Sequence, residues 1–341
     1  MRHLYNIFTD RKRVNLDISN KCTLECIACS RQTNRFNGTP IPGKDMTISQ
    51  WTKVAKHYKY LSLCGQISDP IFNPNLLEFI KIAKEHNTAM SIHTAATAKH
   101  KKLDWYMKAF EIFKKGVFWK FGIDGMPDTS PIYRTNQDAE FLFNVMLKAK
   151  EVGANIQWQY IIFSFNEHQI EEAKKFAKEN KISLQFKKSS RFQGMEVAIP
   201  KEKENYVRKK IISKIVPKCV IGDRTTLGHS ALGFLLPCCW CDYKAFDLRH
   251  KLTKEHEALY NENLHLDKVK NIDEITKSKE WKEFWDILFD DPNNAPEPCK
   301  TKCGVREGEK LRNWSSIVEY HYDKPGQPIR KKDNNKGYVG S

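Results

Sequence analysis

The chain has 341 residues, of which 40% are hydrophobic and 29% are charged, and its formal net charge is +16. This composition is typical of a globular protein with one large core and a smaller module, and it excludes a disordered chain. No apolar run has the length of a transmembrane helix, and the N-terminal segment lacks the features of a signal peptide. We therefore expect a cytoplasmic protein.

The ten cysteines and the excess of basic residues set two further limits. In a cytoplasmic chain, cysteines point to metal binding more than to disulfides, because thiol pools keep them reduced. The positive charge raises encounter rates with anionic partners. Nucleic acid is one such partner, but no DNA- or RNA-binding motif accompanies the charge, and lysines on solvated helix faces account for it equally well.

The first predicted element is a short strand at 14–19, and three cysteines follow it closely: Cys22, Cys26 and Cys29. Iron-sulfur clusters are usually held by four thiolates, so a loop of three leaves one iron open to a small molecule. Zinc is the alternative metal, but its cysteines most often come as two pairs separated by two residues. The spacing, with no histidine close behind, favours an iron-sulfur cluster.

Strands then alternate with amphipathic helices. We predict helices at 47–56, 75–84, 103–114, 139–151 and 167–179, and strands at 60–64, 89–94, 117–123, 156–163 and 182–186. Six strand-helix steps form a parallel sheet with right-handed crossovers. The predicted fold class is therefore α/β, with a partial (β/α)6 barrel over residues 1–190.

Polar or small residues follow the predicted strands, at 65–70, 93–97, 124–134 and 164–167. In parallel β/α folds, the loops that follow the strands meet at one edge of the sheet and carry the reactive groups. We therefore expect these four loops to form one site with the cysteine loop.

The alternation stops at about residue 191. We predict a basic linker at 191–210, a small cysteine-rich α+β auxiliary domain at 211–304, and a basic, largely disordered tail at 305–341. The auxiliary domain contains four well-separated candidate ligands, namely Cys219, Cys238, Cys299 and Cys303. They are enough for a fully ligated second cluster, or for a zinc site, because sulfur ligands do not separate the two metals. Cys239 and Cys241 are alternative ligands or packing thiols.

The spacing of the first three cysteines, C-x3-C-x2-C, resembles the signature of the radical S-adenosylmethionine (SAM) superfamily. The resemblance implies a [4Fe-4S] cluster at Cys22, Cys26 and Cys29 whose open iron binds SAM. It also implies an enzyme that cleaves SAM to a 5′-deoxyadenosyl radical and modifies a substrate with it. An electron donor such as flavodoxin or ferredoxin would reduce the cluster.

The loops after the strands resemble the SAM-binding positions of this family. Where the family commonly has Gly-Gly-Glu-Pro, whose backbone holds the SAM amino group, this chain has Ser68-Asp69-Pro70, with Gly65 shortly before it. His93 and Thr94 resemble the Ser-Thr pair that contacts the ribose and the carboxylate of SAM.

The later loops resemble those of peptide-modifying members. Asp124-Gly125, followed by Tyr133-Arg134, matches a Ser-Ile-Asp-Gly…Tyr-Arg run. The resemblance places Arg134 on the SAM carboxylate, since a guanidinium binds a carboxylate with two parallel hydrogen bonds, and Asp124 near the ribose. Asn166 resembles the adenosine contact, with Ile162 packing on the adenine.

The cysteine-rich segment resembles the SPASM and twitch auxiliary modules through the Gly-x4-Cys element at Gly233 and Cys238. The one-cluster twitch form matches better, because only Cys299 and Cys303 follow. Together the resemblances imply that the substrate is a peptide or protein side chain. Two alternatives stay open: radical SAM modification or dehydrogenation of a small metabolite such as a sugar or nucleotide derivative, and a basic binding protein that is stabilised by zinc. No catalytic acid or base is identified.

Overall fold

The computed structural model describes residues 13–188, 214–215, 226–242, 252–290, 295–305, 317–323 and 330–332. They belong to two compact units, each made of segments that are far apart in the sequence. Unit 1 comprises Met1–Lys21, Thr39–Met90 and Arg208–Leu311, and unit 2 comprises Cys22–Gly38, Ser91–Val207 and Arg312–Ser341. Among the described residues, no helix is both long and apolar enough to cross a membrane.

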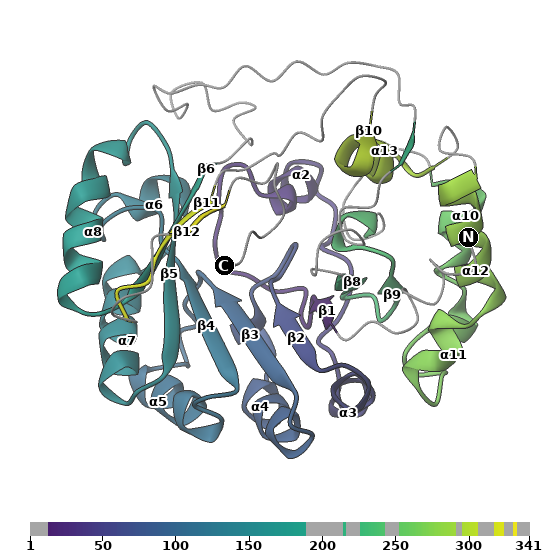
Figure 1. Cartoon of the computed structure of the whole chain (residues 1–341), viewed down its shortest axis with the longest axis horizontal. Coiled ribbons are helices and arrows are strands. Elements are labelled where there is room, and N and C mark those ends of the chain that lie inside the picture. Colours follow the sequence, from purple (N-terminus) through teal and green to yellow (C-terminus); the bar gives the residue numbers. More distant parts are fainter. Residues whose placement is uncertain are drawn as a thin grey trace. The chain divides into compact units, whose positions relative to one another are not determined.

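Unit 2 is a sheet with helices packed on it (Figure 1). Its strands lie in the order β3 (Ala89–Thr94, which begins in unit 1), β4 (Val117–Gly122), β5 (Asn155–Ile162), β6 (Ser183–Lys188), β11 (Ile317–Tyr320) and β12 (Arg330–Lys332). Its helices are α2 (Ser30–Phe36), α5 (Leu103–Ile112), α6 (Ser130–Tyr133), α7 (Ala139–Glu151), η2 (Glu167–Gln169) and α8 (Ile170–Glu179). The pairs β4–β5 and β5–β6 are parallel, whereas β11 is antiparallel to β6.

Aromatic side chains form the core of unit 2 on one face of this sheet. Trp158 of β5 is fully buried and contacts Phe143 of α7 and Phe176 of α8, with ring centroids 5.0 Å and 6.0 Å away. Its indole N–H donates to the carbonyl of Ile123 at 2.8 Å, which ties β5 to the end of β4. The burial of such rings is the main stabilising contribution to this unit.

Unit 1 contains the first strands of the chain and the cysteine-rich segment. Strand β1 (Arg13–Leu16) lies between β2 (Tyr60–Leu63) and β8 (Thr226–His229) and is parallel to both, and β9 (Leu235–Leu236) is antiparallel to β8. A separate ladder pairs β7 (Lys214–Ile215) with β10 (Gly304–Val305). The helices are α3 (Ile48–His57), η1 (Pro70–Phe72), α4 (Leu76–Glu85), η4 (Cys239–Cys241), α10 (Lys254–Ala258), η5 (Glu262–Leu264), α11 (Ile272–Thr276), α12 (Lys279–Asp290) and α13 (Glu297–Cys303).

Local sequence explains how α3 begins and where it packs. Thr47 and Gln50 form a capping box, in which each side chain bonds the backbone N–H of the other residue. Trp51 is fully buried, stacks on Phe79 of α4 at 4.5 Å and donates its indole N–H to the Phe79 carbonyl. The two helices therefore pack through one specific aromatic contact.

The predicted strands and helices of residues 47–188 are present, with ends that differ by a few residues. The described residues within 211–304 lie in unit 1, where β8 pairs with β1, and the separate auxiliary domain stays a prediction. One expectation about the later chain differs from the structure. Within the predicted disordered tail, residues 317–320 and 330–332 form β11 and β12, because β11 pairs with the edge of β6. The barrel shape itself stays a prediction.

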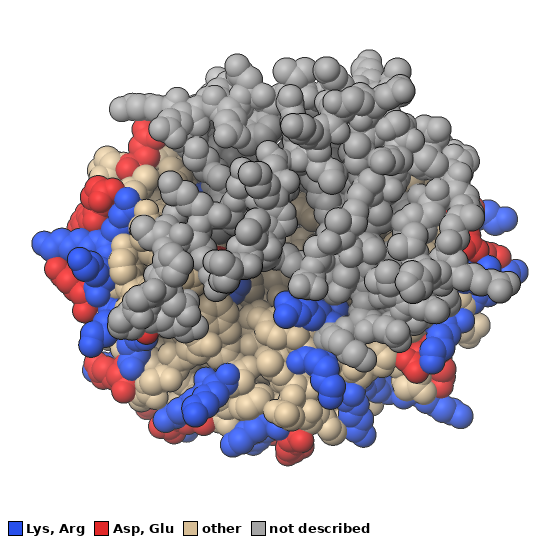
Figure 2. All heavy atoms as spheres, in the orientation of Figure 1, with Lys and Arg blue, Asp and Glu red and all other residues tan. Residues whose placement is uncertain are grey.

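The charged side chains are mixed in sign on the face that Figure 2 shows. There the described Lys and Arg residues are interspersed with Asp and Glu around the rim. Elsewhere in the described chain, charged side chains pair within helices, such as Lys148 with Glu151 at 2.8 Å and Lys282 with Asp286 at 2.9 Å. Exposed pairs of this kind contribute little to stability.

Candidate functional site

The first cysteine loop belongs to unit 2 and leads directly into α2, for which Cys29 is the N-terminal cap residue. Cys22, Cys26 and Cys29 are half-buried. The backbone N–H of Cys29 donates to the carbonyl of Cys26 at 3.0 Å, which holds these two residues in one tight turn. The N–H of Glu25 donates to the carbonyl of Thr135 at 3.0 Å, which ties the loop to the segment after α6.

An apolar cluster packs against this loop. Tyr133 at the end of α6 and Phe163 after β5 are buried, with ring centroids 4.6 Å apart, and Cys26 and Ala28 pack against them. Phe165 stacks on Phe163 at 5.2 Å. The cluster excludes water from one side of the cysteines, which lowers the local dielectric.

A buried ion pair lies close to the same cysteines. The Nε atom of Arg134 is 2.8 Å from Oδ2 of Asp124, and Oδ1 of Asp124 accepts a hydrogen bond from the N–H of Ile161 at 2.7 Å. Burial raises the pKa of Asp124, with Arg134 acting in the opposite direction. Burial alone would lower the pKa of Arg134, but Asp124 and the Cys26 thiol raise it. Both carboxylate oxygens of Asp124 are thus engaged within the protein, and Arg134 stays charged.

The thiols of this loop fit an iron-sulfur cluster in their chemistry. Burial raises the pKa of the Cys26 thiol to about 11, and Arg134 acts against this increase. Iron binds the thiolate form, so a permanent cation beside Cys26 favours the form that a cluster needs. The apolar cluster that packs against Cys26 excludes competing water.

The loop after β5 is shaped by Asn166, which is fully buried. Its Oδ1 accepts from the N–H of Phe163 at 2.8 Å, and its Nδ2 donates to the carbonyls of Asp124 and Ile161 at 2.8 and 3.0 Å. The side chain of Asn166 therefore bonds backbone groups on two loops. These bonds shape the loop, and the adenosine contact that the resemblance implied stays a prediction.

Gln137 is a buried residue whose side chain hydrogen-bonds three segments of the chain, and it was not identified from the sequence. Its Nε2 donates to the carbonyls of Ala95 and Gly122 at 2.6 and 2.9 Å, and its Oε1 accepts from the Ser130 hydroxyl at 2.5 Å. Ser130 in turn accepts from the N–H of Asp124 at 2.8 Å. One amide thus joins the ends of β3 and β4 to α6. A glutamine in a polar stretch gives no spacing signal, so the sequence did not mark it.

The loop after β2 lies in unit 1 and is held by Asp17, another residue that the sequence reading missed. Asp17 is buried and accepts from the N–H of Gln66 at 2.8 Å and the hydroxyl of Ser68 at 2.5 Å. Gly65 has a φ of +47°, and a Cβ there would lie 2.1 Å from the carbonyl oxygen of Ser68. A side chain at position 65 would therefore clash with the backbone of Ser68, so this turn requires glycine.

The other residues predicted to contact SAM lie at the start of η1 and at the ends of β3 and β5. Asp69 is buried in unit 1 and caps η1 by accepting from the N–H of Ile71 at 3.2 Å. His93 and Thr94 end β3, and Ile162 ends β5. Burial, Lys120 and Lys187 lower the pKa of His93 well below its usual range, so its imidazole is neutral at pH 7.

The second thiol group lies in unit 1, around η4, and comprises Cys238, Cys239, Cys241 and Cys299. Hydrogen bonds with Cys238 and Cys299, together with burial, raise the pKa of Cys241 well above its usual range. A hydrogen bond with Cys238, burial and nearby Cys64 do the same for Cys239. Cys241 is thus in contact with two of the four predicted ligands.

The other two predicted ligands of this group fall outside the description: Cys219 and the side chain of Cys303. Across the described ranges, no three His, Cys, Asp or Glu side chains are already arranged as a metal site. The backbone around Cys238 approaches β8 closely, since a Cβ on Gly228 would lie 2.8 Å from the carbonyl carbon of Cys238.

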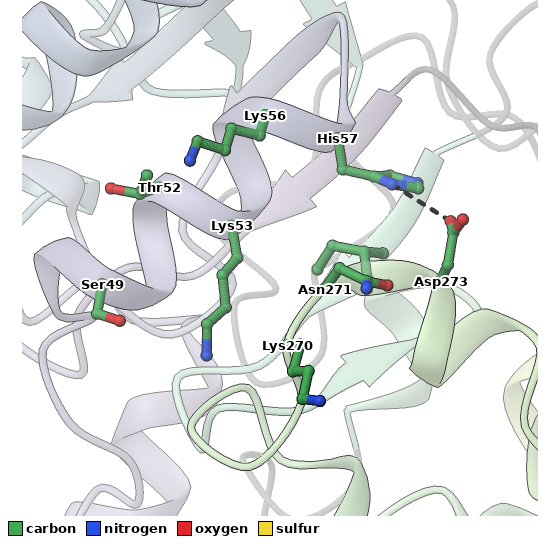
Figure 3. Close-up of a pocket in the computed structure, with 9 residues that line it drawn as sticks. Ser49, Thr52, Lys53, Lys56, His57, Lys270, Asn271 and Asp273 are labelled. Carbon is green, nitrogen blue, oxygen red and sulfur yellow. Dashed lines mark ion pairs between the residues drawn. The ribbon is translucent and has the colours of Figure 1, made fainter.

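A pocket of about 490 Å³ lies in unit 1 between α3 and the start of α11 (Figure 3). Three lysines line it, but the ammonium of Lys53 donates to the carbonyls of Leu266 and Val269 at 2.6 and 2.8 Å. His57 faces Asp273 across the pocket, 3.5 Å away. Lys53, His57 and Asp273 thus link neighbouring segments of the chain. No cysteine is among the residues that line this pocket.

The sequence matches no family model, and no curated protein is similar to it. The fold, however, is similar to that of SuiB from Streptococcus suis. The crystal structure of SuiB bound to S-adenosylmethionine has a TM-score of 0.53 and 14% identity, and the match covers 77% of this chain and 68% of SuiB.

Two further SuiB structures give the same result. SuiB alone has a TM-score of 0.51 over 76% of this chain and 68% of SuiB, and SuiB bound to the precursor peptide SuiA has 0.51 over 77% and 67%, both at 14% identity. The predicted resemblance is thus confirmed for the fold, which is mixed α/β.

Proposed function

We propose that this chain is a radical SAM enzyme in which Cys22, Cys26 and Cys29 hold a [4Fe-4S] cluster. The observation that carries the proposal is the half-buried cation Arg134, which acts on Cys26 and is fixed by the buried carboxylate of Asp124, on a fold similar to that of SAM-bound SuiB. When bound, the cluster and SAM together supply a 5′-deoxyadenosyl radical that abstracts a hydrogen atom from the substrate. The residues of the chain bind, orient and shield these groups.

We assign Arg134 to the carboxylate of SAM. Its Nε pairs with Asp124, and a guanidinium carries further N–H donors in the same plane that are suited to a carboxylate. Asp124 orients Arg134 and neutralises part of its charge. This role replaces the ribose contact that the sequence resemblance implied, because both oxygens of Asp124 are engaged.

Tyr133 and Phe163 keep water away from the cysteine loop. An enclosed, apolar site holds the substrate against the reactive groups and limits side reactions with other molecules. Ile162, at the end of β5, is our candidate for packing on the adenine, and His93 and Thr94 are candidates for the ribose edge. Gly65, Ser68 and Asp69 present the backbone proposed to bind the SAM amino group.

The substrate that we propose is a peptide or protein side chain. The support is the Asp124-Gly125…Tyr133-Arg134 run in the sequence, together with the fold likeness to SuiB solved with its precursor peptide. Reduction requires an electron donor, for which we propose a flavodoxin or ferredoxin.

We further propose that the second thiol group holds an auxiliary iron-sulfur cluster. Cys238 and Cys299 were predicted as ligands together with Cys219 and Cys303, and Cys241 contacts both of the first two. Thiols that approach one another in a buried place are suited to metal ligation once deprotonated.

The test is anaerobic purification and reconstitution with iron and sulfide, followed by incubation with SAM and dithionite. We expect a brown protein that releases 5′-deoxyadenosine, measured by mass spectrometry. Cys22→Ala should abolish this release, whereas Thr23→Ala, which alters the exposed neighbour in the same loop, should retain it. A colourless protein that binds zinc, or a reconstituted protein that forms no 5′-deoxyadenosine, would contradict the proposal.

A further inference from the structure

Gln32 is the third residue of α2 and follows Cys29 by three positions. Its backbone N–H donates to the carbonyl of Cys29 at 2.9 Å, so the two residues share the first turn of the helix. The side chain is half-buried, and its Nε2 atom is buried with no hydrogen-bond partner in the described part of the chain. A buried N–H without a partner is unfavourable, because it has lost its hydrogen bonds to water. Gln32 therefore has a donor for a group that the described residues do not supply.

Helix geometry brings this amide toward Cys29. Residues three apart are neighbours on the same side of a helix. The Cα–Cβ bonds of a helix tilt toward its N-terminus, so a long side chain covers the turn that precedes its own Cα. For Gln32 this turn begins at Cys29, the N-terminal cap residue of α2. The donor of Gln32 thus lies on the side of the helix that carries the last thiol of the cysteine loop.

Three other polar residues of α2 have partners elsewhere in the fold. Arg31 and Asn34 are buried, and both interact with other groups of the protein. Arg35 forms an ion pair with Glu25 of the cysteine loop, with its terminal nitrogen 2.7 Å from the carboxylate. These residues hold α2 and the loop in place, whereas the Gln32 amide keeps an unused N–H next to Cys29.

The acceptor that suits this N–H is a negatively charged atom at the cysteine loop. The thiolate and sulfide sulfurs of an iron-sulfur cluster are acceptors of this kind, and hydrogen bonds to them help to set the reduction potential. Arg134 already acts on Cys26. A neutral donor beside Cys29 would therefore stabilise negative charge at a second corner of the cluster without adding a further cation.

We propose that Nε2 of Gln32 donates a hydrogen bond to a sulfur atom of the cluster at its Cys29 corner, and that this bond makes the cluster easier to reduce. The inference rests on the proposed radical SAM function and deepens it, because it names a residue that controls how readily the cluster accepts its electron. The electron adds negative charge to the cluster, so the hydrogen bond is stronger in the reduced state than in the oxidised state. Gln32 is a positioning residue, since it acts through the cluster and not on the substrate.

Two effects of opposite sign follow for Gln32→Leu, which keeps a side chain of similar size and removes the donor. In the iron-free protein the variant loses a buried N–H that had no partner, so its melting temperature should equal that of wild type or exceed it. In the reconstituted protein the variant loses the hydrogen bond to sulfur, so its reduction potential should fall. A glutamine that only supported the fold would give the reverse, with a lower melting temperature and an unchanged potential.

The test is a reductive titration of the reconstituted protein, followed by electron paramagnetic resonance. The signal that changes when SAM is added identifies the cluster at Cys22, Cys26 and Cys29. We expect Gln32→Leu to lower the equilibrium constant for its one-electron reduction by about tenfold, which corresponds to about 59 mV. Gln32→Glu, which replaces the donor by a negative charge, should lower it further. Phe36→Leu, at the exposed end of the same helix, is the control and should keep the potential of wild type.

Equal potentials of wild type and Gln32→Leu at equal iron content would overturn the inference. A lower melting temperature of iron-free Gln32→Leu would also overturn it, and this measurement does not require the variant to take up a cluster. Failure of the proposed function is seen separately. A wild-type protein that forms no SAM-responsive cluster refutes both proposals, whereas one that forms the cluster and releases 5′-deoxyadenosine, with no shift of potential in Gln32→Leu, refutes only the role of Gln32.

Discussion

The two thiol groups of the molecule differ in what surrounds them. Cys22, Cys26 and Cys29 lie on a half-buried loop, and the charge that acts most strongly on the pKa of Cys26 is the cation Arg134. The group around Cys241 consists of thiols that hydrogen-bond one another, and Cys64 and the carboxylate of Asp17, which lie outside this group, both raise the pKa of Cys239.

This difference indicates that the surroundings of the cysteines, and not the cysteines alone, decide what each thiol group is suited to bind. A cation beside an incomplete set of thiols favours binding of a small molecule with a carboxylate, which is what SAM has. A buried group of mutually contacting thiols is suited to a fully ligated cluster that transfers electrons or holds structure.

The largest expected effect comes from Cys26→Ala. It should abolish 5′-deoxyadenosine release while leaving the auxiliary cluster in place, so iron content should fall by about half and not to zero. Iron analysis and electron paramagnetic resonance, recorded with and without SAM, measure this. Complete loss of iron would show that the two thiol groups are not independent.

The second prediction concerns Arg134, the cation that distinguishes the first thiol group from the second. Arg134→Met leaves the carboxylate of Asp124 buried and without its cation, which should cost about 3–5 kcal/mol in the free energy of unfolding. Lys21→Met, which removes a largely exposed lysine from its pair with Asp45, should cost at most about 1 kcal/mol.

Urea unfolding compares the two variants, and calorimetry with SAM tests the proposed carboxylate contact. We expect Arg134→Lys, which keeps the charge but loses the planar fork, to weaken SAM binding by about tenfold. Unchanged affinity would remove Arg134 from the SAM site.

The third prediction compares Cys241 with Cys239. Because Cys241 contacts both Cys238 and Cys299, Cys241→Ala should lower the iron retained by the auxiliary group, and Cys239→Ala should lower it less. Iron and sulfide are counted after gel filtration. The reverse order would make Cys239 the ligand.

The smallest effect is expected from Gly228→Ala. The added Cβ would lie 2.8 Å from backbone atoms of Cys238 and Cys239, so β8 or the thiol segment must shift, at about 1–3 kcal/mol. Gly38→Ala is the control near the first loop, since nothing lies within 4 Å of its Cβ and only its φ of +63° disfavours alanine. Thermal unfolding should therefore show a larger loss for Gly228→Ala, with iron lost from the auxiliary group alone.

Local patterns in the sequence were sufficient for the longer strands and helices over 47–188, whereas the short helices α6 and η1 were not predicted. They could not show that β8 pairs with β1 or that β11 pairs with β6, because such pairings depend on residues that are far apart in the chain. The sequence did show which strand ends carry polar residues, because loop position follows from element order.

The site was harder to predict in detail. Asp124 and Arg134 were singled out separately, but their ion pair depends on the fold and changes the role assigned to Asp124. The missed buried groups, Asp17 and Gln137, hold loops together through backbone contacts that leave no pattern in the sequence.

The hydrogen bonds of Asp124 and Asn166 to the backbone also make the site observable without any cofactor. The amide protons of Ile161 and Phe163 are donated to these two buried side chains. Exchange of such protons with deuterium requires the loop to open. Both amides should therefore exchange slowly even in the iron-free protein, so mass spectrometry of deuterium uptake can report whether this side of the site is assembled before a cluster is inserted.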